Sequence, residues 1–170
     1  MVQTSRIIRT ATQEDVPYIM PLFDEARAKM QASGNSRQWI NGYPSVEKVL
    51  EDIRQNGAYV VEDKGKTVAY FAFLPSPEPT YEKIVGGQWL DDEKPYHVIH
   101  RIAGAQGVHG IFNSMLEYAF SQENNIRIDT HKDNVIMQHL LQKHGFSYCG
   151  VIYLLSGDER LAYQKIIKSE

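Results

Sequence analysis

The chain has 170 residues, of which 42% are hydrophobic and 23% charged, a composition typical of a folded globular domain. Eighteen basic and 21 acidic residues leave a net charge of −3, which argues against nucleic acid or an anionic membrane as partner, because both favour a basic surface. No apolar run approaches the roughly 18 residues that span a bilayer, residues 1–9 show no secretion signal, and the single Cys149 has no disulfide partner, so the sequence predicts a cytoplasmic protein.

The pattern of apolar residues predicts strands and helices with no internal repeat and no linker, and therefore one domain over residues 1–170. In chain order we expect a strand at 6–11, helices at 12–30 and 46–53, strands at 58–62, 66–74 and 96–103, a helix from 107, a strand at 126–130, a helix at 134–144, and strands at 146–155 and 160–167.

Three local details accompany these elements. Thr12 and Asp15 have the spacing of a capping box, and Pro21 should kink or interrupt the first helix because proline lacks an N–H. Gly86 and Gly87 could turn a small hairpin inside the otherwise unassigned segment 75–95. In the helix at 134–144, we expect four apolar side chains to be buried, namely Ile136, Met137, Leu140 and Leu141.

A glycine-containing turn connects the strand at 96–103 to the helix that follows it. Gly104, Gly107 and Gly110 let the backbone approach a ligand, and the first N–H groups of a helix have no partner within that helix. With the positive end of the helix dipole, these groups suit an anion such as a pyrophosphate. Alternatively, the glycines make only a tight connection, since the turn is neither a Walker loop nor a full dinucleotide fingerprint.

Two segments of the chain resemble signatures of the GNAT superfamily of acyl-coenzyme A-dependent N-acyltransferases. Residues 107–112, Gly-Val-His-Gly-Ile-Phe, occupy the position of its Gln/Arg-x-x-Gly-x-Gly/Ala loop, in which Gly110 matches. Residues 134–146 resemble its Asn…Leu-Tyr-x-x-x-Gly-Phe segment, and the element order agrees over residues 6–167. The resemblance implies an α/β (α+β) fold with a mixed, mostly antiparallel sheet of about six or seven strands, flanked by about four helices, with the fourth and fifth strands splayed apart.

The same resemblance implies that acetyl-CoA binds between the splayed strands as acyl donor. We expect no metal, because the spacing of His97, His100 and His131 contains no His-x-x-x-His or Glu-containing helix signature. The fourth strand would pair with the pantetheine arm, the turn and the start of the next helix would hold the pyrophosphate, and Asn134 would bond the pantetheine arm. Alternatively, Asn134 is a plain helix cap, and both roles could coexist. The expected cofactor-binding residues are Ile102, Ala103, Gly104, Gly107, Val108, His109, Gly110, Ile111, Phe112, Asn113 and Asn134.

Direct transfer of the acyl group needs a base that takes a proton from the amine. His97 and His100 are the candidates, and their spacing puts them on opposite faces of a regular strand. We choose His100 because it directly precedes Arg101 and the expected cofactor-binding backbone, where an N–H near Ile102 or Ala103 would polarise the carbonyl. The alternative for either histidine is a hydrogen-bonded strand residue without a catalytic role.

The leaving thiolate raises a separate question. Many family members protonate it with a tyrosine at a position that is Leu141 here. Tyr153 on the following strand is our candidate acid, with Tyr148 and Cys149 as alternatives, although a coenzyme A thiolate can leave without strong acid assistance.

Other polar and aromatic residues suggest what surrounds the cleft. Asp129 and His131 share one strand face and could orient an amine, or they could only form ion pairs with neighbouring basic residues. Trp39, Tyr43, Tyr81, Trp89 and Tyr96 lie in the two segments that flank the expected cleft, and loops of this kind often shape substrate pockets. Acidic residues near them would suit a cationic amine, or they could be merely solvated; they are Glu47, Asp91, Asp92 and Glu93.

The sequence therefore predicts an N-acetyltransferase that modifies a primary amine of a small molecule, amino acid or peptide. A non-catalytic module that binds coenzyme A or acyl-coenzyme A is the alternative, and a different α/β domain with a purely structural turn is a third. Pairing of the last strands between two subunits would give a homodimer.

Overall fold

Seven strands form one sheet in the computed structural model of the protein, which describes residues 6–168. The strands are β1 (Arg6–Thr10), β2 (Ala58–Asp63), β3 (Lys66–Pro75), β4 (His97–Gly104), β5 (Asn125–Thr130), β6 (Ser147–Tyr153) and β7 (Glu159–Ile166). The helices are α1 (Val16–Ala32), α2 (Val46–Arg54), α3 (Ile111–Gln122) and α4 (Val135–Lys143), with short 3-10 helices η1 (Gln13–Asp15) and η2 (Pro79–Tyr81).

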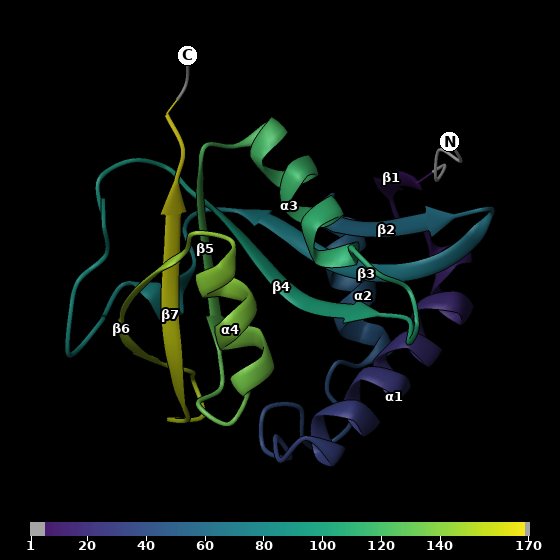
Figure 1. The fold of residues 1–170 in the computed structure, drawn as a ribbon, viewed down its shortest axis with the longest axis horizontal. Coiled ribbons are helices and arrows are strands. Elements are labelled where there is room, and N and C mark those ends of the chain that lie inside the picture. Colours follow the sequence, from purple (N-terminus) through teal and green to yellow (C-terminus); the bar gives the residue numbers. More distant parts are fainter. Residues whose placement is uncertain (1–5, 169–170) are drawn as a thin grey trace.

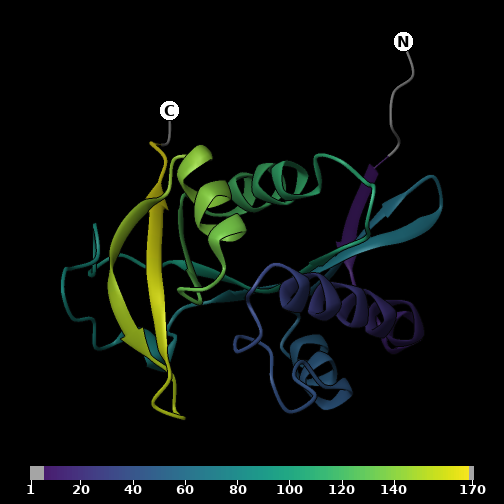
Figure 2. The same cartoon turned by 60° about the horizontal axis from the view of Figure 1, so that its bottom comes forward.

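The sheet is mixed and mostly antiparallel, as predicted, with the strand order β1-β2-β3-β4-β5-β7-β6. Helices α1 and α2 cover one face, and α3 and α4 cover the other (Figures 1 and 2). Strands β4 and β5 are parallel and pair only at His97–Ile126 and Val98–Arg127. Beyond these two pairs they diverge, which confirms the predicted splaying.

Helices α1 and α3 differ from the prediction. Helix α1 continues through Pro21, so the expected interruption is wrong; Ile19, Leu22 and Phe23 of the same helix are at most 5% exposed, and this packing offsets one missing hydrogen bond. Helix α3 begins at Ile111 and not at 107. The left-handed backbone of the preceding glycines cannot continue a right-handed helix.

The segment 75–95 forms no hairpin at Gly86 and Gly87, contrary to expectation. Instead it contains η2 and pairs with the sheet edge through Val85, whose N–H and C=O both bond Val151 at 2.9 Å. Helix α4 buries Leu141 completely, but Ile136 is 48% exposed, so that predicted core position is wrong. Strand β6 forms one edge of the sheet, where the predicted pairing of two subunits would have to occur.

Two hydrophobic clusters hold the helices to the sheet. One lies between the sheet and α3 and α4, and the other between the sheet and α1 and α2. In the second, Phe23 packs edge-on against Trp39 and Tyr70. Trp39 belongs to the loop between α1 and α2, so this contact fixes that loop against α1. Within residues 6–168, no helix is long and apolar enough to cross a membrane.

Candidate active site

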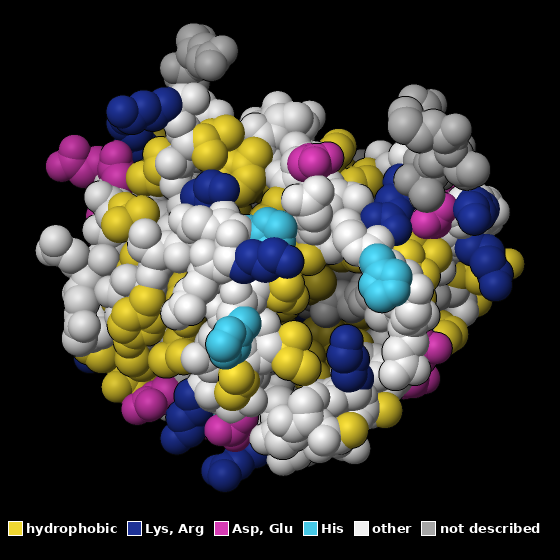
Figure 3. Space-filling model, in the orientation of Figure 1, with side chains coloured by type: hydrophobic (Ala, Val, Ile, Leu, Met, Phe, Trp, Pro, Cys, Tyr) yellow, Lys and Arg dark blue, Asp and Glu magenta, His cyan; other side chains and the backbone are white. Residues whose placement is uncertain are grey.

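The divergence of β4 and β5 opens a cavity of about 830 Å³. Its walls are the α1–α2 loop with Trp39 and Tyr43, the end of β3, β4 from Val98 to Ile102, the end of β5, and the β6–β7 turn. Figure 3, in the orientation of Figure 1, shows the surface hollowed between α4 and the turn that precedes α3. A volume of this size accommodates a small ligand or part of a larger one.

Strand β4 contains a bulge at this cavity. His100 pairs with Ala72 and Ala103 pairs with Tyr70, so β4 carries one more residue than β3 over this interval. Arg101 has a left-handed backbone with φ 55°, which costs a residue other than glycine about 1 to 3 kcal/mol. The bulge lets His100 and Arg101, although adjacent in sequence, both line the cavity.

His97 and His100 lie on opposite faces of β4, as their spacing predicts. The His97 ring packs against Phe73 at 4.5 Å, and its Nδ1 lies 3.6 Å from the carboxylate of Glu123. Burial lowers the pKa of His97, and Glu123 partly counteracts this. Only His100 of this pair lines the cavity.

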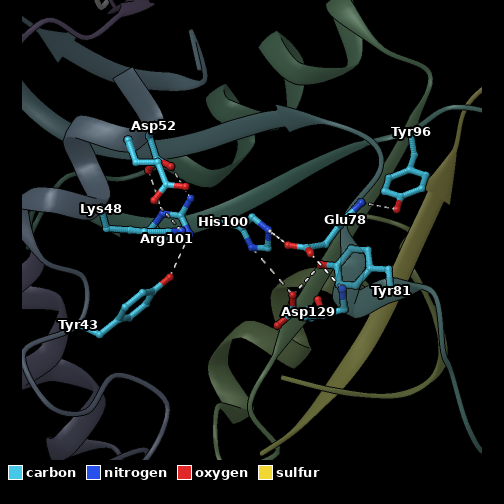
Figure 4. A network of polar contacts seen from close by, with 11 residues as sticks. Tyr43, Lys48, Asp52, Glu78, Tyr81, Tyr96, His100, Arg101 and Asp129 are labelled. Atoms are coloured by element: carbon cyan, nitrogen blue, oxygen red, sulfur yellow. Dashed lines mark hydrogen bonds and ion pairs between the residues drawn. The ribbon is translucent and has the colours of Figure 1, made fainter. Parts of the chain in front are cut away.

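Two carboxylates flank His100, as Figure 4 shows. Its Nε2 lies 3.3 Å from Glu78 Oε1, and its Nδ1 lies 4.0 Å from Asp129 Oδ2. The hydrogen bond with His100 lowers the pKa of Glu78, whose other oxygen accepts from the Thr80 N–H. Sequence reasoning missed Glu78 and the link to Asp129, because both partners are distant along the chain.

A buried tyrosine holds Asp129 in place. The Tyr81 hydroxyl donates to Asp129 Oδ2 at 2.6 Å. Burial, and then the negative charge of Asp129, raise the pKa of Tyr81 well above its usual value of 10, so this hydroxyl remains a donor. The contact fixes one carboxylate beside His100.

On the other side of His100, Arg101 forms an ion pair with Asp52 of α2. Its Nε and Nη2 donate to the two carboxylate oxygens at 2.9 and 2.6 Å, and its Nη1 donates to the Tyr43 hydroxyl at 3.0 Å. The Tyr70 hydroxyl also donates to Asp52, at 2.6 Å. The network thus joins α2, β3, β4 and the α1–α2 loop. Figure 4 shows the contacts among Tyr43, Asp52 and Arg101.

The predicted cofactor turn lies between β4 and α3. Gly107 and Gly110 have φ values of 79° and 76°, and Gly110 is the N-cap of α3. Arg6 of β1 braces this turn from behind: it donates to the Ser114 side chain at 3.1 Å and to the His109 carbonyl, and it pairs with Asp63. The sequence alone gave no signal for the role of Arg6.

The structure also fits a pantetheine arm. Past Val98, the β4 edge that faces β5 has no partner strand among the described residues, so its backbone groups are available. Asn134 lines the cavity; its side-chain oxygen caps α4 through the Met137 N–H, and its amide nitrogen donates to Gln38. The predicted helix cap is confirmed.

The candidate acids lie apart from this cavity. Tyr153 is 39% exposed at the end of β6 and is not part of the cavity wall. Tyr148 is 51% exposed and packs against Tyr163. Cys149 is 5% exposed, and burial raises the pKa of its thiol, which makes it a poor nucleophile near neutral pH.

Some of the aromatic and acidic residues that we expected at the cleft instead contact Arg127. Trp89 and Tyr96 sandwich the guanidinium of buried Arg127 at 3.9 and 3.8 Å. The Asp91 carbonyl and the Asp92 carboxylate accept hydrogen bonds from the same guanidinium. These contacts fasten the segment 75–95, and with it Glu78 and Tyr81, to β5.

Asp129 and His131 line different cavities. Asp129 lines the large cavity, whereas His131 lines a smaller one of about 340 Å³ that shares Ile40 and Asp158 with it. His131 Nδ1 accepts from the Asp133 N–H, and burial lowers its pKa. Over residues 6–168, no group of three or more His, Cys, Asp or Glu side chains is arranged to hold a metal ion.

Comparison with solved structures finds the same architecture in acetyltransferases. A GNAT-family acetyltransferase from Streptococcus agalactiae is 34% identical, with a TM-score of 0.88, over 99% of this chain and 100% of that one. A putative acetyltransferase from Staphylococcus aureus is 25% identical, with a TM-score of 0.69, over 95% and 99% of the two chains. A structure of the NatC complex bound to Gag peptide and CoA shares the fold, with 13% identity and a TM-score of 0.65 over 96% and 99%.

Comparison with curated proteins finds a partial similarity. The protein translocase subunit SecA of Lawsonia intracellularis is 26% identical over 110 residues, which are 64% of this chain. The chain spans 13% of the length of that relative, so the similarity concerns one segment of SecA. No family model matches the chain.

The splayed sheet, the bulged β4 and the full-length structural similarity define an acyltransferase of the acetyltransferase type. At 34% identity over nearly the whole of both chains, the relationship is specific enough to name the family. The chain belongs to the GNAT family of acetyltransferases.

Proposed function

We propose that the protein transfers an acetyl group from acetyl-CoA to a primary amine of a small molecule, amino acid or peptide. The observation that carries this proposal is the cavity in the split between β4 and β5, which has His100 and two carboxylates on its wall. A donor entering from the α3–α4 side and an acceptor from the α1–α2 side would meet there.

Residues of β4 and of the following turn are suited to the donor. The free edge of Ile102, Ala103 and Gly104 offers backbone groups to the pantetheine amides, as an added strand would. The N–H groups of residues 107–113 and the α3 dipole suit the pyrophosphate. The NatC complex, which has the same fold, is bound to CoA. Acetyl-CoA supplies the activated thioester.

His100 would take the proton that the amine loses as its nitrogen bonds the thioester carbon. The positive charge that this proton brings would lie 3.3 Å from Glu78 and 4.0 Å from Asp129, and both carboxylates attract it. The same charges favour an acceptor that arrives as an ammonium ion. The carbonyl oxygen would face a backbone N–H of the β4 bulge, the carbon–sulfur bond then breaks, and the thiolate departs.

One observation favours a second function, a non-catalytic module that binds coenzyme A or an acyl-coenzyme A. Leu141 stands where many family members have the acid tyrosine, and it is fully buried. Tyr153 remains our candidate for that role, although its ring would have to move to reach the cavity. A module of this kind would bind the donor without turning it over.

Two measurements on the same sample separate these functions. Calorimetric titration with acetyl-CoA tests donor binding, and thiol release with a panel of polyamines, amino acids and peptides tests transfer. Saturable binding with amine-dependent thiol release supports the enzyme. Binding without release from any amine supports the module, and absence of binding would refute both.

A further inference from the structure

The proposed reaction leaves one buried ion pair without a role. The side chains of Arg101 and Asp52 are 5% and 2% exposed, and both hydrogen bonds between them are shorter than 3 Å. Removing two charges from water is unfavourable, and an apolar pair of similar volume often serves stability as well or better. Stability alone is therefore a weak reason for this pair.

The position of the pair in the chain is more informative than its burial. Arg101 is the left-handed residue of the β4 bulge, where glycine would be the ordinary choice because it adopts this backbone without steric cost. An arginine there needs its surroundings to hold the backbone. Its side chain provides this through Asp52 on α2 and Tyr43 on the α1–α2 loop.

Asp52, the ion-pair partner of Arg101, is itself held in place. Asp52 accepts a further hydrogen bond from Tyr70, which is fully buried in β3. Burial, followed by the charge of Asp52, raises the pKa of Tyr70, so its hydroxyl stays protonated and remains a donor. Tyr70 is also the strand partner of Ala103, at the end of the bulge. The network thus holds the bulge both through Arg101 within β4 and through Tyr70 on the neighbouring strand β3.

We propose that Asp52 and Arg101 are positioning residues that fix the β4 bulge and aim the backbone N–H of Ile102 at the carbonyl of the bound thioester. This inference rests on the proposed acetyl transfer. Neither side chain needs to touch the donor. Their loss should therefore lower kcat while leaving acetyl-CoA affinity nearly unchanged.

Two double variants separate positioning from ordinary packing. Asp52→Leu with Arg101→Met replaces the pair with apolar side chains and should fold. Asp52→Leu with Arg101→Gly leaves a cavity and should be the less stable of the two, yet glycine adopts the left-handed backbone freely. We expect kcat to fall by about a hundredfold to a thousandfold in the Met variant, the range for a lost oxyanion donor, and to recover partly in the Gly variant.

The ranking of the two variants decides between the explanations. Positioning predicts higher kcat in the less stable Gly variant, with acetyl-CoA dissociation constants within about threefold of the parent protein, a difference below 1 kcal/mol. A purely structural role predicts that kcat follows stability, with the higher kcat in the more stable Met variant. That result would overturn the inference, and so would an unchanged kcat in the Met variant. If the parent protein shows no turnover, the proposed function fails first. Crystal structures of the variants then decide. A left-handed backbone at position 101 in the Met variant would refute the claim that the ion pair holds this conformation.

Discussion

Replacing His100 with glutamine tests the proposed base directly. Glutamine keeps a polar side chain near Glu78 and Asp129 but cannot accept and release a proton near neutral pH. His100→Gln should therefore lower kcat and leave the affinity for acetyl-CoA unchanged, because the expected donor contacts come from the backbone of other β4 residues.

The magnitude follows from the position of His100. A positioned general base contributes about 10²- to 10⁴-fold, which corresponds to roughly 3 to 5 kcal/mol of activation free energy. Its side chain is 20% exposed, so water can reach the site and replace part of this contribution. We therefore expect a loss near the lower end, about a hundredfold in kcat.

His97→Gln is the matched control. His97 lies on the same strand and is 27% exposed, but it faces Phe73 and Glu123 on the other side of the sheet. Steady-state thiol release with the best amine, together with thermal unfolding of both variants, compares the two. A loss of less than about threefold in a folded His100→Gln variant, or equal losses in both variants, would refute the assignment of His100 as the base.

Three further predictions concern the donor site and stability. Gly110→Glu should abolish acetyl-CoA binding, measured by calorimetry, because the carboxylate repels the phosphates. Gly110→Asn should retain binding, because asparagine tolerates the φ of 76° and carries no charge. Equal affinities of the two variants would refute the placement of the turn. The hydrogen bond from Arg9 lowers the pKa of Asp15 below its usual value of 3.8. The pair therefore stabilises the fold at pH values above 3.8, and this stabilisation is lost as the pH falls through the folded-state pKa. Urea unfolding should show Asp15→Asn destabilised near neutral pH, with the difference from the parent shrinking as the pH falls below 3.8, and a pH-independent difference would contradict this. Leu141→Ala should cost about 2 to 5 kcal/mol in the same assay, more than Leu140→Ala at a half-buried position.

The sequence predicts elements well where the pattern is local. The β2–β3 hairpin, helix α2 and strand β5 begin and end within two residues of their predicted bounds, because alternation and turn glycines encode them over a few residues. The segment 75–95 could not be predicted in this way. Its order comes from Arg127, which lies more than thirty residues away and contacts the rings of Trp89 in the segment and of Tyr96 directly after it.

The same distinction applies to the site. His100 and the glycine turn could be proposed because they lie on one strand and directly after it, but the partners of His100 come from the N-cap of η2 and from β5. The bulge was unpredictable from local sequence, since its left-handed residue is an arginine and not a glycine. One available signal was missed: Asp52 lies three residues after Val49 on the buried side of α2, and a charge on an apolar helix face needs a buried partner.

The arrangement of charges bears on how this protein could act without the tyrosine that Leu141 replaces. An acceptor ammonium must lose one proton before attack and a second when the amide forms, whereas a thiolate can leave as an anion. The more demanding proton transfers thus occur on the acceptor side of the cavity. Beside His100, the carboxylates of Glu78 and Asp129 would stabilise a protonated base, and Arg101, paired with Asp52, would not repel it. A site built in this way depends on its base and on the β4 bulge more than on an acid, which is why substitutions at positions 100 and 101 should affect turnover more than those at position 153.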